Sequence, residues 1–248
     1  MKLAIISPNS LLDRYSQTDY HLILPDMLKD PEYYRFYHSV ARGWKVLDNG
    51  AHEEGTRSPN ELFRIAEILQ VDEIVVPDVI GDRGTTLDMA ASFEPHAYEA
   101  NPRYQYMGVV QGSSAGEAWE CLRELTDYFP WIKSIGIPQH LCRFDQHIRV
   151  EMAETIDQWM GHQVHLLGNN SRWPREVKHL SDLKCVVGHD TTYPVKMGLR
   201  GYYISDREVP NVPRDPDYFE FYRDVVELQD YVIKENIRVY KSWCDGTT

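Results

Sequence analysis

The chain has 248 residues and a formal net charge of −12. This length suits one α/β barrel, or a domain plus a small appendage, with a full buried core. The acidic balance argues against indiscriminate nucleic-acid binding without excluding a local basic groove. Four widely spaced cysteines indicate reduced thiols in a cytoplasmic protein rather than a zinc knuckle. The N-terminal apolar run is too short for a signal peptide, and no stretch approaches the ~20 apolar residues of a membrane helix.

Short apolar runs alternate with helical patterns along the chain. The first run, Leu3–Ser7, predicts a first strand or an edge hairpin element, and His21–Leu24 is an alternative for the first barrel strand. The further predicted strands are 44–48, 73–78, 106–111, 131–137, 163–168, 184–190 and 201–204. Capping boxes at Ser58 and Ser114 predict two helix starts. The other predicted helices are 31–42, 85–100, 143–160, 173–181 and 217–237.

This alternation of strands and helices with short links predicts a parallel sheet, with one βα unit every ~20 to 35 residues. We therefore predict a single-domain (β/α)8 TIM barrel over 1–248, in which 205–248 is a C-terminal linker and helix. An open doubly wound sheet is the alternative, and the absence of a glycine-rich phosphate loop after an early strand weakens it.

Polar residues follow the ends of several predicted strands, and in a closed parallel barrel those ends converge on the face that carries the active site. These residues are Asp48, Asp78, Gln111, Asn169 and Asp190.

Several of these positions belong to short motifs that occur in a fixed order over about residues 20–205. The motifs are Asp48-Asn-Gly-Ala-His-Glu53, Asp78, Gly108-Val-Val-Gln111-Gly112, Leu166-Leu167-Gly168, and Asp190 with Pro194 and Lys196. In order and spacing they resemble the tRNA-guanine transglycosylase family. Its members are (β/α)8 barrels that exchange a guanine in a polynucleotide for a 7-deazaguanine.

The resemblance is incomplete in two places. The family's Gly-Gly-Leu segment reads Gly136-Ile137-Pro138 here. The family's Cys-x-Cys-x-x-Cys…His zinc site, with the C-terminal extension that carries it, is absent from this sequence. A short chain without that zinc region resembles the compact, phage-type branch of the family, which inserts 7-deazaguanines into DNA.

The resemblance implies catalytic roles for two carboxylates. Asp190 would be the nucleophile that holds the sugar covalently between two displacements at C1′, with retained stereochemistry. Asp48 would protonate the leaving base and deprotonate the incoming one. Two nearby acids can take different roles when their pKa values are pushed apart.

The resemblance also implies a base-recognition set. Asp78 would accept from N1–H and the exocyclic amine of guanine, Gln111 would contact O6, and Leu167 would pack on the base plane. The other expected substrate-binding residues are Gly112, Gly136, Ile137, Asn169 and His189. The target base must leave its stack to reach them. Candidate phosphate contacts are Lys196 and Arg200, with Arg172 and Arg175 as an extension.

Some histidines have simpler explanations. His189 is better explained as a packed or supporting histidine than as a catalyst, and His52 lies in an acidic, solvated loop. His162 and His165 are three residues apart, but no third ligand completes a metal set, so we expect neither a metal nor a cofactor.

The sequence thus predicts a DNA-guanine transglycosylase whose partners are DNA and a free 7-deazaguanine base. A tRNA-acting member of the family is the alternative. A non-catalytic nucleic-acid-binding relative ranks third, because such relatives tend to lose the carboxylates that are present here. The aromatic terminal helix leaves a homodimer or a partner protein open. We expect the protein in the cytoplasm, that of the host if a phage encodes it, and not in a membrane.

Overall fold

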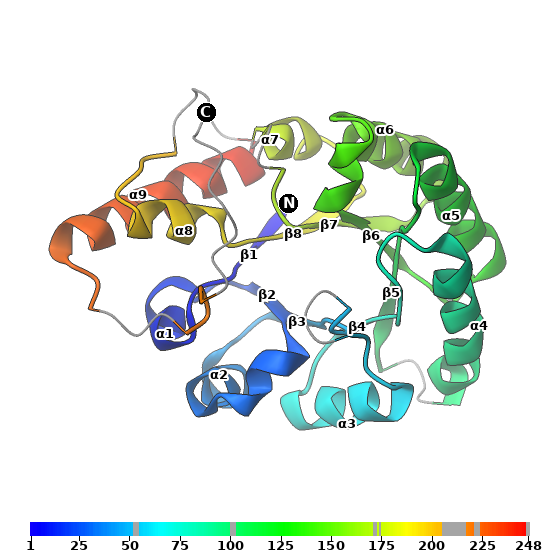
Figure 1. Cartoon of the computed structure of the whole chain (residues 1–248), viewed down its shortest axis with the longest axis horizontal. Coiled ribbons are helices and arrows are strands. Elements are labelled where there is room, and N and C mark those ends of the chain that lie inside the picture. Colours follow the sequence, from blue (N-terminus) through cyan, green and yellow to red (C-terminus); the bar gives the residue numbers. More distant parts are fainter. Residues whose placement is uncertain are drawn as a thin grey trace.

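The computed structural model describes residues 1–51, 55–99, 103–170, 173, 175–204, 217–220 and 224–246. Eight parallel strands form a nearly closed barrel with helices around it (Figure 1). The strands are β1 (Lys2–Ile5), β2 (Tyr20–Ile23), β3 (Trp44–Leu47), β4 (Glu73–Val75), β5 (Gln105–Val109), β6 (Ser134–Pro138), β7 (Gln163–Leu167) and β8 (Val186–Thr191). The predicted single-domain (β/α)8 barrel is confirmed.

Parallel ladders run from β1 to β8 and then from strand to strand down to β2. The first and last members of this series, β1 and β2, lie beside each other and complete the ring (Figure 1). The strands are short and buried almost throughout, because alternate side chains fill the barrel interior while the others pack under the helices.

The helices and short helical turns follow the strands in the expected alternation. The α-helices are α1 (Leu12–Tyr15), α2 (Pro31–Arg35), α3 (Pro59–Leu69), α4 (Arg83–Glu99), α5 (Ala115–Tyr128), α6 (Ile148–Thr155), α7 (Glu176–Leu180), α8 (Tyr193–Leu199) and α9 (Glu227–Cys244). Short 3-10 or π-helical turns occupy Asn9–Leu11, Pro25–Lys29, Phe36–Val40, Gln139–Arg143 and Ile156–Met160. None of the described helices is both long and apolar enough to cross a membrane.

Both predicted helix caps are confirmed. The Ser58 hydroxyl accepts from the Glu61 N–H at 3.4 Å at the start of α3, and the Ser114 hydroxyl accepts from the Glu117 N–H at 3.2 Å at the start of α5. In the second helix the Glu117 carboxylate accepts from the Ser113 N–H and hydroxyl. These bonds satisfy backbone donors that the first turn leaves unpaired.

One end of the barrel agrees with the prediction and the other does not. The predicted strand that begins at Leu3 is the first strand, β1, because Leu3, Ala4 and Ile5 pair with 189–191 of β8, and the apolar run 21–24 belongs to the second strand, β2. The predicted closing strand at 201–204 is wrong, since these residues form a turn and extended chain after α8. An apolar run becomes a barrel strand when it pairs with a strand on each side. The periodicity of the sequence does not show which strands will be its neighbours.

The C-terminal helix also differs. It begins at Glu227 instead of 217 and continues to Cys244. Tyr218, expected in that helix, lies against the barrel instead and donates from its hydroxyl to the Ile6 carbonyl at 2.8 Å. In Figure 1, α9 lies along α8. A Cβ at Gly198 would be 2.4 Å from Ile233 Cγ1, so only glycine allows the two helices to approach this closely.

Candidate functional site

A cavity of about 370 Å³ opens at the carboxyl ends of the barrel strands. This volume lies within the ~300–1,000 Å³ that small-molecule sites usually have. Each of the eight strands contributes a residue to the lining, at its carboxyl end or just beyond it. In strand order these residues are Ile6, Leu24, Asp48, Asp78, Gln111, Pro138, Leu167 and Asp190.

The cavity brings together all five polar residues predicted at strand ends. The expected residues that line it are Asp48, Asp78, Gln111, Leu167, Asn169, Asp190 and Lys196. Asp78, Gln111 and Asp190 are buried, whereas Asp48 and Lys196 are partly exposed. The convergence of strand ends thus gathers these residues as expected.

Three residues that were expected to contact the base, Gly112, Gly136 and Ile137, do not line the cavity. A Cβ at Gly112 would be 2.6 Å from the Ala118 nitrogen, so Gly112 packs against the first turn of α5. A Cβ at Gly136 would be 2.9 Å from Leu167 Cδ1, which places Gly136 beneath that side chain. Ile137 is fully buried on the opposite face of β6. Pro138, Gln139 and His140 line the cavity in this region.

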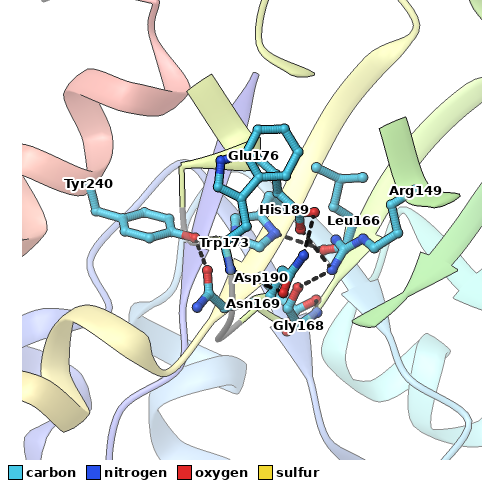
Figure 2. Close-up of polar contacts among 10 residues, drawn as sticks. Arg149, Leu166, Gly168, Asn169, Trp173, Glu176, His189, Asp190 and Tyr240 are labelled. Carbon is cyan, nitrogen blue, oxygen red and sulfur yellow. Dashed lines mark hydrogen bonds and ion pairs between the residues drawn. The ribbon is translucent and has the colours of Figure 1, made fainter. Parts of the chain in front are cut away.

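His189 does not line the cavity either. It precedes Asp190 on β8 and therefore points to the opposite face, toward α9 (Figure 2). Its Nδ1 lies 2.9 Å from the Leu166 carbonyl and its Nε2 lies 2.8 Å from the Tyr240 hydroxyl, which in turn donates to Asn169. Burial lowers the pKa of His189 to about 3, so the ring is neutral. The structure thus makes His189 a packed histidine behind the nucleophile candidate.

The expected phosphate contacts are only partly gathered. Lys196, on α8, lines the cavity, whereas Arg200 is exposed at the end of the same helix and Arg175 precedes α7. Arg172, together with His52 and Glu53 of the first motif, lies outside the described residues.

On one side of the cavity, Asp78 is held by two amide groups. Its Oδ1 accepts from Asn49 Nδ2 at 2.5 Å, and its Oδ2 accepts from Gln111 Nε2. The Gln111 carbonyl oxygen is also engaged, since it accepts from the Gly81 N–H at 2.9 Å. Burial raises the pKa of Asp78 to about 6, and the two amide donors only partly oppose that shift. Gln111 therefore orients Asp78, a role that we did not predict.

Asn49 is the second unpredicted member of this group. Its Nδ2 also donates to the Val76 carbonyl at 2.8 Å, and its Oδ1 accepts from the Ala51 N–H at 2.8 Å. These bonds fix the loop after β3 against the end of β4. The sequence signal was its position directly after Asp48, where two successive polar residues end an apolar run.

On the other side, Asp190 receives two hydrogen bonds on one oxygen. Its Oδ1 lies 3.1 Å from His165 Nε2 and accepts from the Gly168 N–H at 3.1 Å. Burial alone would raise the pKa of Asp190, but the hydrogen bonds from His165 and from the Gly168 amide hold it below its usual value. Asp190 is therefore a carboxylate at neutral pH.

His165 was missed as a site residue, although β7 carries a signal for it. It lies two positions before Leu167, so both side chains point to the same face of the strand. His162, its suspected companion, instead has Nδ1 2.9 Å from the Met160 carbonyl. In the part of the chain that the structure describes, no three His, Cys, Asp or Glu side chains are grouped to hold a metal.

The turn that presents the Gly168 amide rests on a buried ion pair (Figure 2). Gly168 has a φ of +70°, a conformation that glycine adopts at little cost. Its carbonyl accepts from Arg149 Nη1 at 2.9 Å, and the same nitrogen lies 3.2 Å from Glu176 Oε1. Asn170 donates to Glu176 at 3.0 Å. Arg149 and Glu176 are both fully buried, so this support is shielded from solvent.

Comparisons with known proteins identify the fold and no family. The sequence matches no protein-family model and no curated protein. The structure is similar to a D-psicose 3-epimerase from Clostridium cellulolyticum H10 determined with D-tagatose. The TM-score is 0.54 at 12% sequence identity, over 99% of this chain and 100% of the epimerase. At this identity the likeness shows a shared barrel architecture.

Proposed function

We propose that this protein is a pentosyltransferase that replaces guanine in DNA with a 7-deazaguanine by base exchange. The observation that carries the proposal is the cavity in which a buried, ionised Asp190 lies with Asp48 and with an amide-bound Asp78. The order of the sequence motifs, which resembles that of the guanine transglycosylases, supplies the reaction class.

In the first displacement, a lone pair of the Asp190 carboxylate forms a bond to C1′ of the sugar. The C1′–N9 bond breaks, its electrons go to the departing guanine, and the protonated form of Asp48 supplies the proton that neutralises the base. In the second displacement, Asp48 takes the N9 proton of the incoming base, N9 bonds to C1′, and the bond to Asp190 breaks. The carboxylate is regenerated, and the stereochemistry at C1′ is retained.

Asp78 supports recognition of the guanine edge. A carboxylate offers about four lone-pair sites, and Asn49 and Gln111 occupy one on each oxygen. One site on each oxygen thus remains for the N1–H and the exocyclic amine. A base without these donors would leave the two remaining acceptor sites of a buried carboxylate unfilled, and such a site rejects that base.

The choice of DNA rests on the resemblance to the compact branch of the family. A flipped nucleotide would bring its phosphates to the rim, where Lys196 lines the cavity. A tRNA substrate is the alternative for the same chemistry. A non-catalytic nucleic-acid-binding relative is the alternative from another class.

The test is an exchange assay with radiolabelled guanine and duplex DNA, single-stranded DNA or tRNA. Native protein is compared with Asp190→Ala and with Asp230→Ala, a matched control on α9 whose carboxylate binds Tyr15 and Lys234. We expect label in DNA with the native protein and the control, and none with Asp190→Ala. Label in tRNA alone would change the polymer and keep the chemistry. No transfer, even when 7-deazaguanine bases are supplied, would leave the non-catalytic alternative.

A further inference from the structure

A fully buried histidine connects Asp190 to a tyrosine across the barrel interior. His165 Nδ1 lies 2.8 Å from the Tyr20 hydroxyl, and His165 Nε2 lies 3.1 Å from Asp190 Oδ1. The Tyr20 ring stacks on the imidazole, with 5.5 Å between ring centroids and 25° between the ring planes. The three groups come from β2, β7 and β8, so the barrel itself brings them together.

The hydrogen-bond partners fix the tautomer of this histidine. Burial, with the charges of Glu73 and Asp190, raises the pKa of Tyr20 well above its usual value, so the phenol keeps its proton. A protonated phenol next to an imidazole nitrogen donates to it, which makes Nδ1 the acceptor. The ring proton is then on Nε2, and Nε2–H donates to Asp190.

Gly188 provides the space for this pair. It lies opposite His165 in the β7–β8 ladder. A Cβ at this position would be 2.4 Å from the Tyr20 hydroxyl oxygen and 2.7 Å from His165 Nδ1. Any side chain at Gly188 would therefore displace the Tyr20–His165 contact.

We infer that Tyr20 and His165 are positioning residues that fix Oδ1 of Asp190 as a hydrogen-bond acceptor and leave Oδ2 as the oxygen that attacks C1′. This inference rests on the proposed function and deepens it. Both donors to Asp190, His165 Nε2–H and Gly168 N–H, end on Oδ1. An oxygen that accepts two hydrogen bonds is the weaker nucleophile, so the new bond forms at the other oxygen.

The same two donors have a role in the second displacement. When Oδ2 is bonded to C1′, Asp190 is an ester and Oδ1 is its carbonyl oxygen. As the Oδ2–C1′ bond breaks, its electron pair returns to the carboxylate, and negative charge reappears on Oδ1. Donors already aimed at that oxygen stabilise the charge without reorganisation. His165 thus helps Asp190 both to attack and to leave.

The activity test compares His165→Leu, which removes the donor, with His165→Gln, which can place an amide N–H near the position of Nε2. His21→Leu is the matched control, because His21 is a buried histidine of β2 that bonds the Arg42 carbonyl and packs edge-on against Phe36. We expect a roughly 100-fold slower single-turnover exchange for His165→Leu. His165→Gln should stay within about 10-fold of native protein, and His21→Leu should be unchanged.

Nitrogen-15 NMR of the histidine rings tests the tautomer without any substrate. The His165 signals are assigned by their loss in His165→Gln. We expect protonated Nε2 and unprotonated Nδ1 in the native protein at pH 7, with the Nδ1 signal shifted in Tyr20→Phe. The Nδ1–H tautomer in native protein would overturn the inference even if the leucine variant failed to fold.

The outcomes separate this inference from the proposed function. Native-like exchange by His165→Leu, with Asp190→Ala inactive, overturns the inference and leaves the proposed function intact. Loss of exchange in His165→Leu with recovery in His165→Gln supports it. If the native protein exchanges no base in any polymer, the proposed function fails and the assignment of an attacking oxygen fails with it.

Discussion

Two buried aspartates line the same cavity in opposite environments. Asp78 accepts from the neutral amides of Asn49 and Gln111, and its pKa is raised by burial to about 6. Asp190 accepts from His165 and the Gly168 amide, and its pKa lies below the usual value although it is equally buried. Two neutral side-chain amides therefore do not offset the loss of hydration, whereas an imidazole with a backbone amide does.

The difference suits the roles proposed for the two groups. A nucleophile has to be ionised at neutral pH, which the surroundings of Asp190 ensure. A recognition group has to bind hydrogen-bond donors of the base, and a carboxylate that holds its charge weakly gains most when those donors arrive. Opposite pKa shifts in one cavity are a usual sign of divided roles.

The comparison is tested most strongly by carboxamide substitution of each aspartate. Asp190→Asn can keep the acceptor for His165 and Gly168 but cannot form the covalent intermediate, so we expect exchange to fall at least ~10³-fold. Asp78→Asn retains the nucleophile and should lose roughly 100-fold, mainly through a higher KM for DNA. Single-turnover rates at several DNA concentrations measure both effects. Equal loss of kcat in the two variants would contradict the division of roles.

The ion pair behind Gly168 gives the next largest expected effect. Arg149→Met leaves the Glu176 carboxylate buried without its partner, which should lower the free energy of unfolding by about 3–5 kcal/mol. Denaturant unfolding measures the loss. Arg83→Met is the matched control, because Arg83 pairs with Glu124 nearer the surface, where water already solvates the charges, and its loss should lower the stability far less.

A double variant separates the cost of an unpaired buried charge from the loss of the hydrogen bond that supports the turn at Gly168. Arg149→Met with Glu176→Gln removes both charges and should regain most of the stability. Like that of Arg149→Met, its exchange rate should be lower than that of the native protein, because the Gly168 carbonyl lacks the Arg149 donor in both variants. Full recovery of both properties would show that the ion pair does not position Gly168.

The pH dependence of stability should have opposite signs for the two aspartates. Between the usual aspartate pKa and about 6, native Asp78 holds more proton than in the unfolded chain, so its contribution to stability falls as pH rises. Relative to Asp78→Asn, native protein should lose about 2–3 kcal/mol from pH 4 to pH 7. The Asp190 contribution is present above about pH 4 and is lost as pH falls further. Denaturant midpoints across pH measure both, and parallel slopes would contradict the comparison.

The sequence predicts one of these two environments better than the other. The carboxylates themselves follow apolar runs, and barrel topology alone gathers them, so Asp78 and Asp190 could be predicted to share a cavity. The hydrogen-bond partners of Asp190 are harder to predict. His165 was considered only as a possible metal ligand together with His162, because the spacing of residues along the chain does not show that Asp190 lies beside His165 on the neighbouring strand.

The buried ion pair of Arg149 could not be predicted from the sequence either, because its partner lies far away along the chain. Arg149 lies in a segment predicted as a helix, where an arginine normally faces water, and Glu176 and the Gly168 carbonyl make its complete burial tolerable. His189 was also named among the residues expected to contact the base. Adjacent residues on a strand face opposite sides, which sends His189 toward Tyr240.

The smallest expected effect concerns the amide that holds Asp78. Gln111→Leu removes one of the two side-chain donors that oppose the effect of burial, so the pKa of Asp78 should rise above about 6. The lost hydrogen bond should cost about 1 kcal/mol of stability at neutral pH. Gln105→Leu is the matched control, because it makes the same change at the other end of β5. Carbon-13 NMR titration of labelled aspartate carboxyls measures the shift. If the pKa of Asp78 stays the same or falls in Gln111→Leu, the Gln111 amide does not oppose the effect of burial on Asp78.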